Sequence, residues 1–129
     1  MWRISVAFLT AVAGTVLLVS ACSTTGKSAE AKAADRGEAL VREFGCAGCH
    51  AKDETDGLGP GWGNIWGTER ALENGRSVLV DREYLRRSVA DPGAEIVQGF
   101  MPRMPLFPLS DEELDDISVY LQYVTGGKP

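Results

Sequence analysis

The chain has 129 residues, of which 44% are hydrophobic and 24% are charged, with a formal net charge of −5 and an isoelectric point near 4.8. This acidic balance argues against nucleic acid or an anionic membrane surface as a partner, because both repel a negatively charged protein. Arg3 is the only charged residue among the first 21, so removing that segment leaves a net charge of −6 on roughly a hundred residues, enough for one small domain.

Residues 1–21 have the pattern of a secretory signal. Arg3 precedes an apolar run over residues 4–19, and small residues stand directly before Cys22. This ending resembles the lipobox of bacterial lipoproteins, which implies cleavage before Cys22 and acylation of that cysteine. An ordinary signal peptide and an uncleaved anchor are the alternatives, although the apolar run is short for a spanning helix. We expect an exported bacterial lipoprotein, held at the cell membrane by its acyl chains and facing the periplasm or the cell exterior.

A tether and a helix are predicted next. Residues 22–33 are mostly small and polar, with no apolar periodicity, which is typical of a flexible tether. Residues 34–44 are predicted to form an amphipathic helix, because Val41 and Phe44 fall on one side of it. Gly37 lies one turn before Val41 and lowers the helix propensity, so we expect another helix to approach closely at this point.

The sequence Cys-Ala-Gly-Cys-His at residues 46–50 is the attachment motif of a c-type haem. Cys46 and Cys49 would form thioethers with the haem vinyl groups, and His50 would reach the iron. A zinc site needs four ligands, but His50 is the only histidine and Cys22 the only other cysteine. A redox-active dithiol pair is a second alternative, which the downstream residues disfavour. We therefore predict one covalently bound haem c.

Two segments without long helices follow the motif. The glycine-rich stretch 53–67 is expected to wrap the haem edge, with Trp62 and Trp66 as large apolar walls. Ordinary core packing is the alternative for both tryptophans, and it predicts the same buried positions as a haem wall does. Residues 70–80 contain an Asn-Gly pair between short flanks that favour strands, which predicts a small β-hairpin.

The rest of the chain predicts two helices joined by an ordered coil. Asp81 has the pattern of an N-cap for a short helix over 82–90, which ends at an Asp-Pro pair. Residues 93–109 contain three prolines but are too apolar for disorder. Ser-Asp-Glu-Glu at 110–113 forms a capping box, and apolar residues at helical spacing continue to a final Gly-Gly pair.

The single histidine limits the second axial ligand of the iron. Bis-histidine ligation by this chain alone is excluded. Met1 lies in the segment expected to be removed, so Met101 and Met104 are the two candidate sulfur ligands. Without a methionine, the second axial position would hold a weaker ligand or stay open.

In this order of helix, C-x-x-C-H motif, Gly-Pro loop, short helix, Met-Pro pair and final helix, the chain resembles a class I cytochrome c from Ala34 to its C-terminus. The later part resembles still more the cytochrome c domain fused to subunit II of caa-type cytochrome oxidases, in the segments LENG (72–75), VDREYL (80–85), ADP (90–92), IVQGF (96–100) and MP (104–105). The chain has no room for the copper domain of such a subunit. The resemblance implies an all-α class I cytochrome c fold over residues 34–129, with crossing terminal helices, a short middle helix and a small β-hairpin insertion.

The resemblance also implies the roles of individual residues. Cys46 and Cys49 would be the covalent anchors of the haem, and His50 the proximal ligand. The Pro60 carbonyl would accept the other ring N–H of His50 and fix its orientation. Met104 would be the distal ligand. Two residues of the first helix would cross three of the last one, namely Gly37 and Val41 against Ile117, Tyr120 and Leu121.

Two positions depart from the family pattern. Asn64 stands where a glycine is common, and Thr68 stands where the mitochondrial relatives have an arginine near a haem propionate. With Thr68 in place of that arginine, Arg70 and Trp66 are the two candidate partners of the propionate. Trp62 and Trp66 would also line the pocket.

The choice between the two methionines follows from the same resemblance. Both precede a proline. In the family, the ligand lies about five residues beyond the loop glycine, here Gly99, which selects Met104. Met101 would pack within the loop and is the alternative ligand.

A haem with both axial positions filled by the protein has no place for a small-molecule substrate, so we expect a one-electron carrier and not an enzyme. A thioether ligand favours Fe(II) and raises the reduction potential relative to bis-histidine ligation. The expected partners are a quinol-oxidising complex as donor and a terminal oxidase as acceptor. The alternatives are a fixed relay subunit of a respiratory complex, and a gas-binding or peroxide-reactive haem protein.

Overall fold

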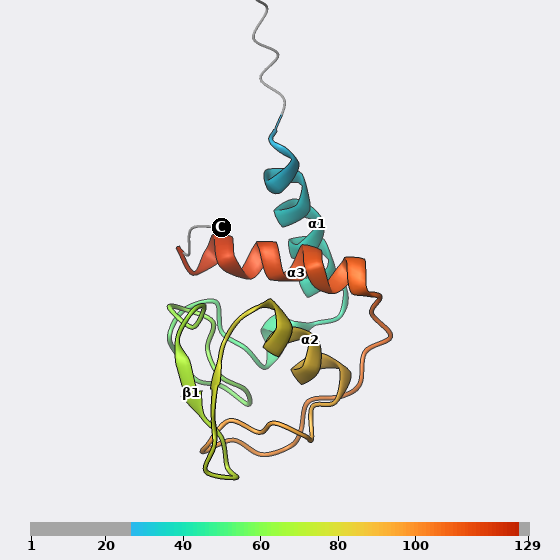
Figure 1. The fold of residues 1–129 in the computed structure, drawn as a ribbon. Helices are drawn as coiled ribbons and strands as arrows, with labels where there is room; N and C mark the ends of the chain where they lie inside the picture. The colour runs from blue at the N-terminus through green and yellow to red at the C-terminus, as the bar shows by residue number, and fades with distance from the viewer. Residues whose placement is uncertain (1–26, 127–129) are drawn as a thin grey trace, which may run out of the picture.

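The computed structural model describes residues 27–126 (Figure 1). Its elements are the α-helices α1 (Ala29–Glu43), α2 (Arg82–Ala90) and α3 (Asp111–Val124), the 3-10 turn η1 (Cys46–Gly48), and the strands β1 (Glu69–Ala71) and β2 (Ser77–Leu79). The predicted signal segment and Cys22 lie outside the described residues. Within them, no helix is long and apolar enough to cross a membrane. The fold is mainly helical with one small hairpin, which confirms the predicted fold class.

Helix α1 begins five residues earlier than predicted. Ser28 is its N-cap, and the Ser28 hydroxyl oxygen accepts a hydrogen bond from the Ala31 backbone N–H at 3.1 Å. Residues 29–33 read Ala-Glu-Ala-Lys-Ala, all strong helix formers, so the helix extends outward from its packed part without needing an apolar stripe. The prediction of a tether over residues 22–33 is therefore wrong from residue 29 onward.

The crossing of α1 and α3 depends on Gly37, as predicted. Helix α3 runs across the lower half of α1 (Figure 1). A Cβ atom on Gly37 would lie 2.6 Å from the carbonyl carbon of Asp116 and 2.8 Å from the Cβ of Tyr120. No side chain fits in that space, so the two backbones touch directly. Val41, one turn further along, is fully buried in the same contact.

An ion pair that the sequence did not reveal joins the same two helices. The Arg36 guanidinium donates two hydrogen bonds to the Asp116 carboxylate, each 2.6 Å long. Asp116 is buried, and a buried carboxylate needs such a partner to offset its lost hydration. The hydrogen bond to Asp116 raises the pKa of Arg36 above its ordinary value.

Both predicted helix caps are present. Asp81 accepts a hydrogen bond from the Tyr84 backbone N–H at 2.8 Å. At α3, the Ser110 hydroxyl accepts from the Glu113 N–H at 3.3 Å, and the Glu113 carboxylate accepts from the Ser110 N–H at 2.7 Å, which completes the capping box. The bond from the Ser110 backbone N–H is the main reason that the pKa of Glu113 lies below the ordinary 4.5.

The hairpin is also confirmed. Strands β1 and β2 are antiparallel, with Arg70 opposite Val78, and the Asn-Gly pair forms the turn between them. Gly75 has φ +80°, a left-handed conformation that favours glycine. An isolated bridge between Leu72 and Val97 attaches the hairpin to the coil between α2 and α3.

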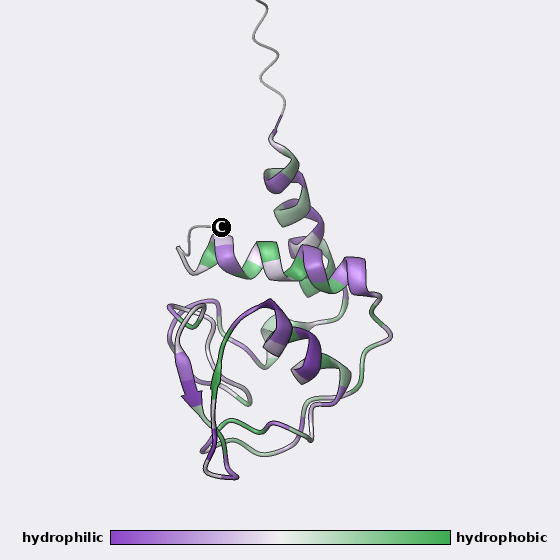
Figure 2. Ribbon diagram, in the orientation of Figure 1, coloured by the Kyte–Doolittle hydropathy of each residue, from purple (hydrophilic) through white to green (hydrophobic). Residues whose placement is uncertain are grey.

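The core is formed where the crossing helices meet the wrapped segments. Hydrophobic bands alternate with hydrophilic ones along α3, while α2 is mostly hydrophilic (Figure 2). The buried cluster draws on α1, the glycine-rich loop, the hairpin, α2 and α3, through Val41, Trp62, Ile65, Val80, Tyr84, Ile117, Tyr120 and Leu121.

Candidate functional site

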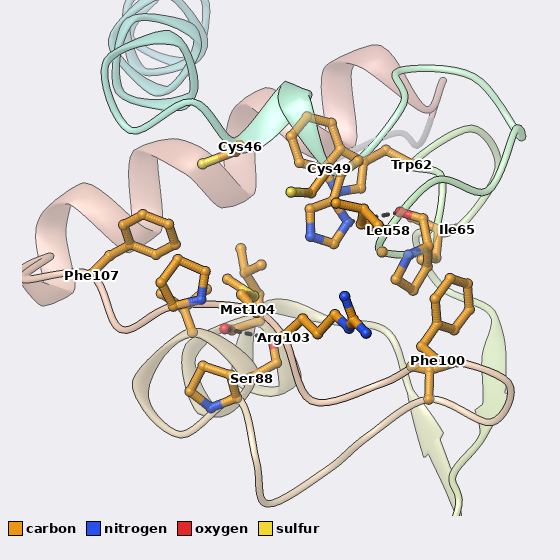
Figure 3. Close-up of a pocket in the computed structure, with 18 of the residues that line it drawn as sticks. Cys46, Cys49, Leu58, Trp62, Ile65, Ser88, Phe100, Arg103, Met104 and Phe107 are labelled. Carbon is orange, nitrogen blue, oxygen red and sulfur yellow. Dashed lines mark hydrogen bonds between the residues drawn. The ribbon is translucent and has the colours of Figure 1, made fainter.

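A mostly apolar cavity of about 320 Å³ opens beside η1 (Figure 3). The end of α1, the glycine-rich loop, α2, the coil after α2 and α3 all contribute to its lining. Apolar side chains predominate, including Val41, Phe44, Ile65, Val80, Leu85, Val89, Ile96, Phe100, Phe107, Ile117 and Leu121. Such a lining suits a large apolar ligand held by a few polar groups.

The two cysteines of the motif lie together on one side of this cavity (Figure 3). Gly45, with φ +68°, turns the chain between α1 and η1 and so presents the motif. No disulfide joins Cys46 and Cys49. Partial burial raises the pKa of the Cys46 thiol. Each cysteine therefore presents its own sulfur atom to the cavity, as two thioether bonds require.

The imidazole of His50 is held on three sides. Its Nδ1 lies 2.8 Å from the Pro60 carbonyl oxygen, the contact that the family resemblance implied. Because a carbonyl can only accept, Nδ1 carries the proton, and in the neutral ring Nε2 keeps a free lone pair. Trp62 stacks on the ring with 5.4 Å between centroids and 8° between planes. A Cβ atom on Gly59 would lie 2.8 Å from both ring nitrogens, so the Gly59 backbone closes the third side.

The glycine-rich loop wraps back on the motif. The Gly59 N–H donates to the Cys49 carbonyl at 3.0 Å, and the Trp62 N–H donates to the Ala51 carbonyl at 2.8 Å. Asn64 has φ +53°, the left-handed region that asparagine tolerates better than most residues. This conformation explains why asparagine can stand where the family has glycine.

The structure distinguishes the two candidate methionines. Both line the cavity. Met104 is partly buried and lies across the cavity from the cysteines (Figure 3). Met101 is 63% exposed, and its sulfur accepts a contact from the Arg103 guanidinium at 3.6 Å. Met104 is therefore the better placed of the two for an inward role.

These features agree with the comparison of the chain with known families. The sequence model described as cytochrome c matches residues 34–125. The chain belongs to the cytochrome c family. A search of curated proteins found no match. Membership means that the protein binds haem c covalently, transfers electrons through it, and is not an enzyme.

The cavity of this cytochrome c fits its cofactor. It supplies two thiols, an imidazole with a free nitrogen and a thioether across from them, all in apolar surroundings. Within residues 27–126, no three His, Cys, Asp or Glu side chains gather as a separate metal site.

The two candidate propionate partners occupy different places. Trp66 lines the cavity, whereas Arg70 lies outside the lining. The Nε of Arg70 is buried and has no hydrogen-bond partner among the described residues. A buried donor of this kind needs an acceptor, and a haem carboxylate is one. The sequence pointed to both residues but could not show this unpartnered donor.

Several lining residues were not assigned a role from the sequence. Phe107 follows Met104 by three residues and packs edge-on against Phe44, with centroids 5.7 Å apart and planes at 72°. Tyr84 is buried and also lines the cavity. The apolar positions of helix α2 were the one available signal for Tyr84, and the coil around Phe107 has no periodicity to read.

Proposed function

We propose that this cytochrome c is a membrane-tethered electron carrier of a respiratory chain that passes electrons to a terminal oxidase. The observation that carries the proposal is the cavity in which His50 and Met104 lie among apolar walls. A protein ligand on each side of the iron leaves no open position for a substrate, which suits one-electron transfer.

The proposed roles follow the geometry. Cys46 and Cys49 are the thioether anchors, and His50 binds the iron through Nε2 while Pro60 holds its Nδ1 proton. Met104 is the distal ligand, and Met101 is the fallback. When bound, the haem supplies one iron that alternates between Fe(II) and Fe(III).

The surroundings of the haem favour a positive reduction potential. The apolar lining disfavours the extra positive charge of the ferric state, and a thioether ligand acts in the same direction. Such a potential is compatible with a terminal oxidase as acceptor. A strongly negative measured potential would contradict the proposal.

Carbon monoxide tests whether the iron is closed. We expect the absorption spectrum of the reduced holoprotein to stay unchanged when CO is added, because both axial positions are occupied. A shift of the main haem band would show an open or easily displaced position. A gas-binding or peroxide-reactive haem protein would then replace the electron carrier as the best account.

The partners are proposed from the resemblance of segments 72–75, 80–85, 90–92, 96–100 and 104–105 to the cytochrome c domain of caa-type oxidases. A quinol-oxidising complex would be the donor and a terminal oxidase the acceptor. A fixed relay subunit would use the same haem residues. Stable co-purification with an integral membrane complex in mild detergent would identify a relay subunit, and its absence would identify a mobile carrier.

The membrane tether is proposed from the sequence alone. The small residues before Cys22 match a lipobox, which favours acylation of Cys22 and an exported lipoprotein. We expect Cys22→Ser to move the holoprotein from the membrane fraction to the soluble fraction, while Ser23→Ala leaves it in the membrane fraction. Equal retention of both variants in the membrane would overturn the lipid anchor.

A further inference from the structure

The coil that carries Met104 is tied to the rest of the protein mainly at its two ends. Over residues 100–109, the hydrogen bonds among described residues are local: Phe100 N–H to the Val97 carbonyl, Arg103 N–H to the Met101 carbonyl, Leu109 N–H to the Phe107 carbonyl, and Arg103 to the Met101 sulfur. Prolines at 102, 105 and 108 remove three backbone donors. The position of Met104 therefore depends on side-chain packing and on how the ends of the coil are fixed.

The far end of the coil is fixed by α3. The capping box holds Ser110, and Arg86 of α2 pairs with Asp111 at 2.6 Å and with Asp115 at 2.9 Å. These contacts set where the coil ends, five residues beyond Met104. They do not set the direction in which the chain leaves the hairpin.

The near end is fixed by the β-hairpin. The Glu73 N–H donates to the Ile96 carbonyl at 2.9 Å, and the Gln98 N–H donates to the Ala71 carbonyl at 2.8 Å. The Glu73 carboxylate then accepts a hydrogen bond from the Gly99 N–H at 2.6 Å. Glu73 thus holds the coil through both its backbone and its side chain.

Glu95 strengthens the same junction. Its carboxylate pairs with Arg87 of α2 at 3.0 Å and with Arg76 of the hairpin at 3.5 Å. The side chain of Glu95 is 16% exposed, so these pairs are partly shielded from water. The hairpin, α2 and the coil are joined just before Gly99.

Gly99 is the last residue held before the locally bonded stretch. Its φ of +89° sets the direction in which the chain turns toward Met101 and Met104. The bond from its N–H to a carboxylate is of the charge-assisted kind, which is stronger than a bond between neutral groups. Without this hydrogen bond, the backbone could rotate at Gly99, and glycine tolerates such rotation better than any other residue.

We propose that Glu73 is a positioning residue for the distal ligand. By fixing Gly99, its carboxylate limits how far the Met104 sulfur can withdraw from the cavity, and so sets how readily an outside ligand replaces it. The inference rests on the proposed ligation by Met104 and extends it to a residue 31 positions earlier in the chain.

Imidazole, which competes with methionine for ferric iron, tests the inference on the holoprotein. We expect Glu73→Ala to bind imidazole about tenfold more tightly than the unchanged protein, since a loss of about 1.4 kcal/mol from the methionine-bound state gives that factor. The far-red absorption of sulfur-bound ferric haem should disappear at correspondingly lower imidazole concentrations. Glu73→Gln keeps an acceptor oxygen for Gly99 and should stay within about threefold of the unchanged protein.

Two controls separate this effect from loss of charge or of general stability. Glu69 belongs to the same hairpin, and its exposed carboxylate makes no hydrogen bond or ion pair with the described residues. Glu69→Ala should therefore leave the imidazole affinity unchanged. Arg36→Ala removes the ion pair between α1 and α3, which involves no residue of the coil, and should lower stability without changing imidazole affinity. An equal gain of affinity in either control would overturn the specific role of Glu73.

Met104→Ala distinguishes failure of this inference from failure of the proposed ligation. If Met104→Ala increases imidazole affinity strongly while Glu73→Ala does not, Met104 is the ligand and the positioning role of Glu73 is wrong. If Met104→Ala leaves imidazole affinity unchanged, the distal ligand itself is misassigned.

Discussion

Replacing Met104 with alanine is expected to abolish the low-spin His/Met spectrum, whereas replacing Met101 is expected to preserve it. Met104 is partly buried and faces the cavity across from the haem cysteines, while Met101 is 63% exposed and contacts Arg103 (Figure 3). Without a distal sulfur, the iron gains an open position. The reduced Met104→Ala protein should then bind CO, and its ferric form should bind imidazole on the order of a hundredfold more tightly.

The comparison of the two methionine variants is the decisive part of this experiment. Both substitutions remove a thioether that precedes a proline, so they match in chemistry and differ in placement. Optical and magnetic spectra of the purified holoproteins would report the spin state and the axial ligands. Equal loss of sulfur ligation in both variants would contradict the assignment, and loss in Met101→Ala alone would transfer the role to Met101.

Replacing Gly37 with alanine is expected to lower the free energy of unfolding by about 2–3 kcal/mol. In an exposed helix, the same change would stabilise the protein by roughly 1 kcal/mol, because alanine has the higher helix propensity. Here the added Cβ would lie 2.6 Å from the carbonyl carbon of Asp116 and 2.8 Å from the Cβ of Tyr120, so α1 and α3 must move apart. Overpacking of this kind outweighs the propensity gain. The melting temperature should fall by roughly 10–20 °C.

Gly93→Ala is the matched control for this prediction. A Cβ atom on the exposed Gly93 would meet only the Asp91 carboxylate, at 3.7 Å, and Gly93 is not in the left-handed conformation. The stability of this variant should stay within about 0.5 kcal/mol of that of the unchanged protein. Thermal or denaturant unfolding, followed by circular dichroism, measures both variants. A Gly37→Ala protein as stable as the Gly93→Ala protein would show that the helices adjust without cost.

Features encoded by neighbouring residues were predictable from the sequence. The haem motif occupies five consecutive residues, and the hairpin turn is an Asn-Gly pair. In both helix caps, the capping side chain bonds a backbone N–H only three residues further along the chain. The contact of Gly37 with α3 and the bond from His50 to Pro60 span more of the chain. They were predicted because a glycine inside a helix and the family resemblance each supplied a specific signal.

Features that depend on tertiary placement were not predictable in the same way. Arg36 and Asp116 are 80 residues apart, and Glu73 and Gly99 are 26 apart, so no local pattern connects either pair. The start of α1 was missed for a different reason. Small and polar residues such as Ala, Glu and Lys are common in flexible tethers and are also strong helix formers, and Ser28 decides between these outcomes by capping the helix.

If Cys22 carries the proposed lipid, the early start of α1 would also limit where the protein can meet a redox partner. With the lipid on Cys22 as proposed, six residues separate the anchor from Ala29, and six residues span at most about 20 Å. The first half of α1 extends away from the rest of the domain (Figure 1). The haem domain would therefore remain within a few nanometres of the bilayer surface. Its search for donor and acceptor would then be two-dimensional, and only cofactors lying near the membrane plane would be within reach.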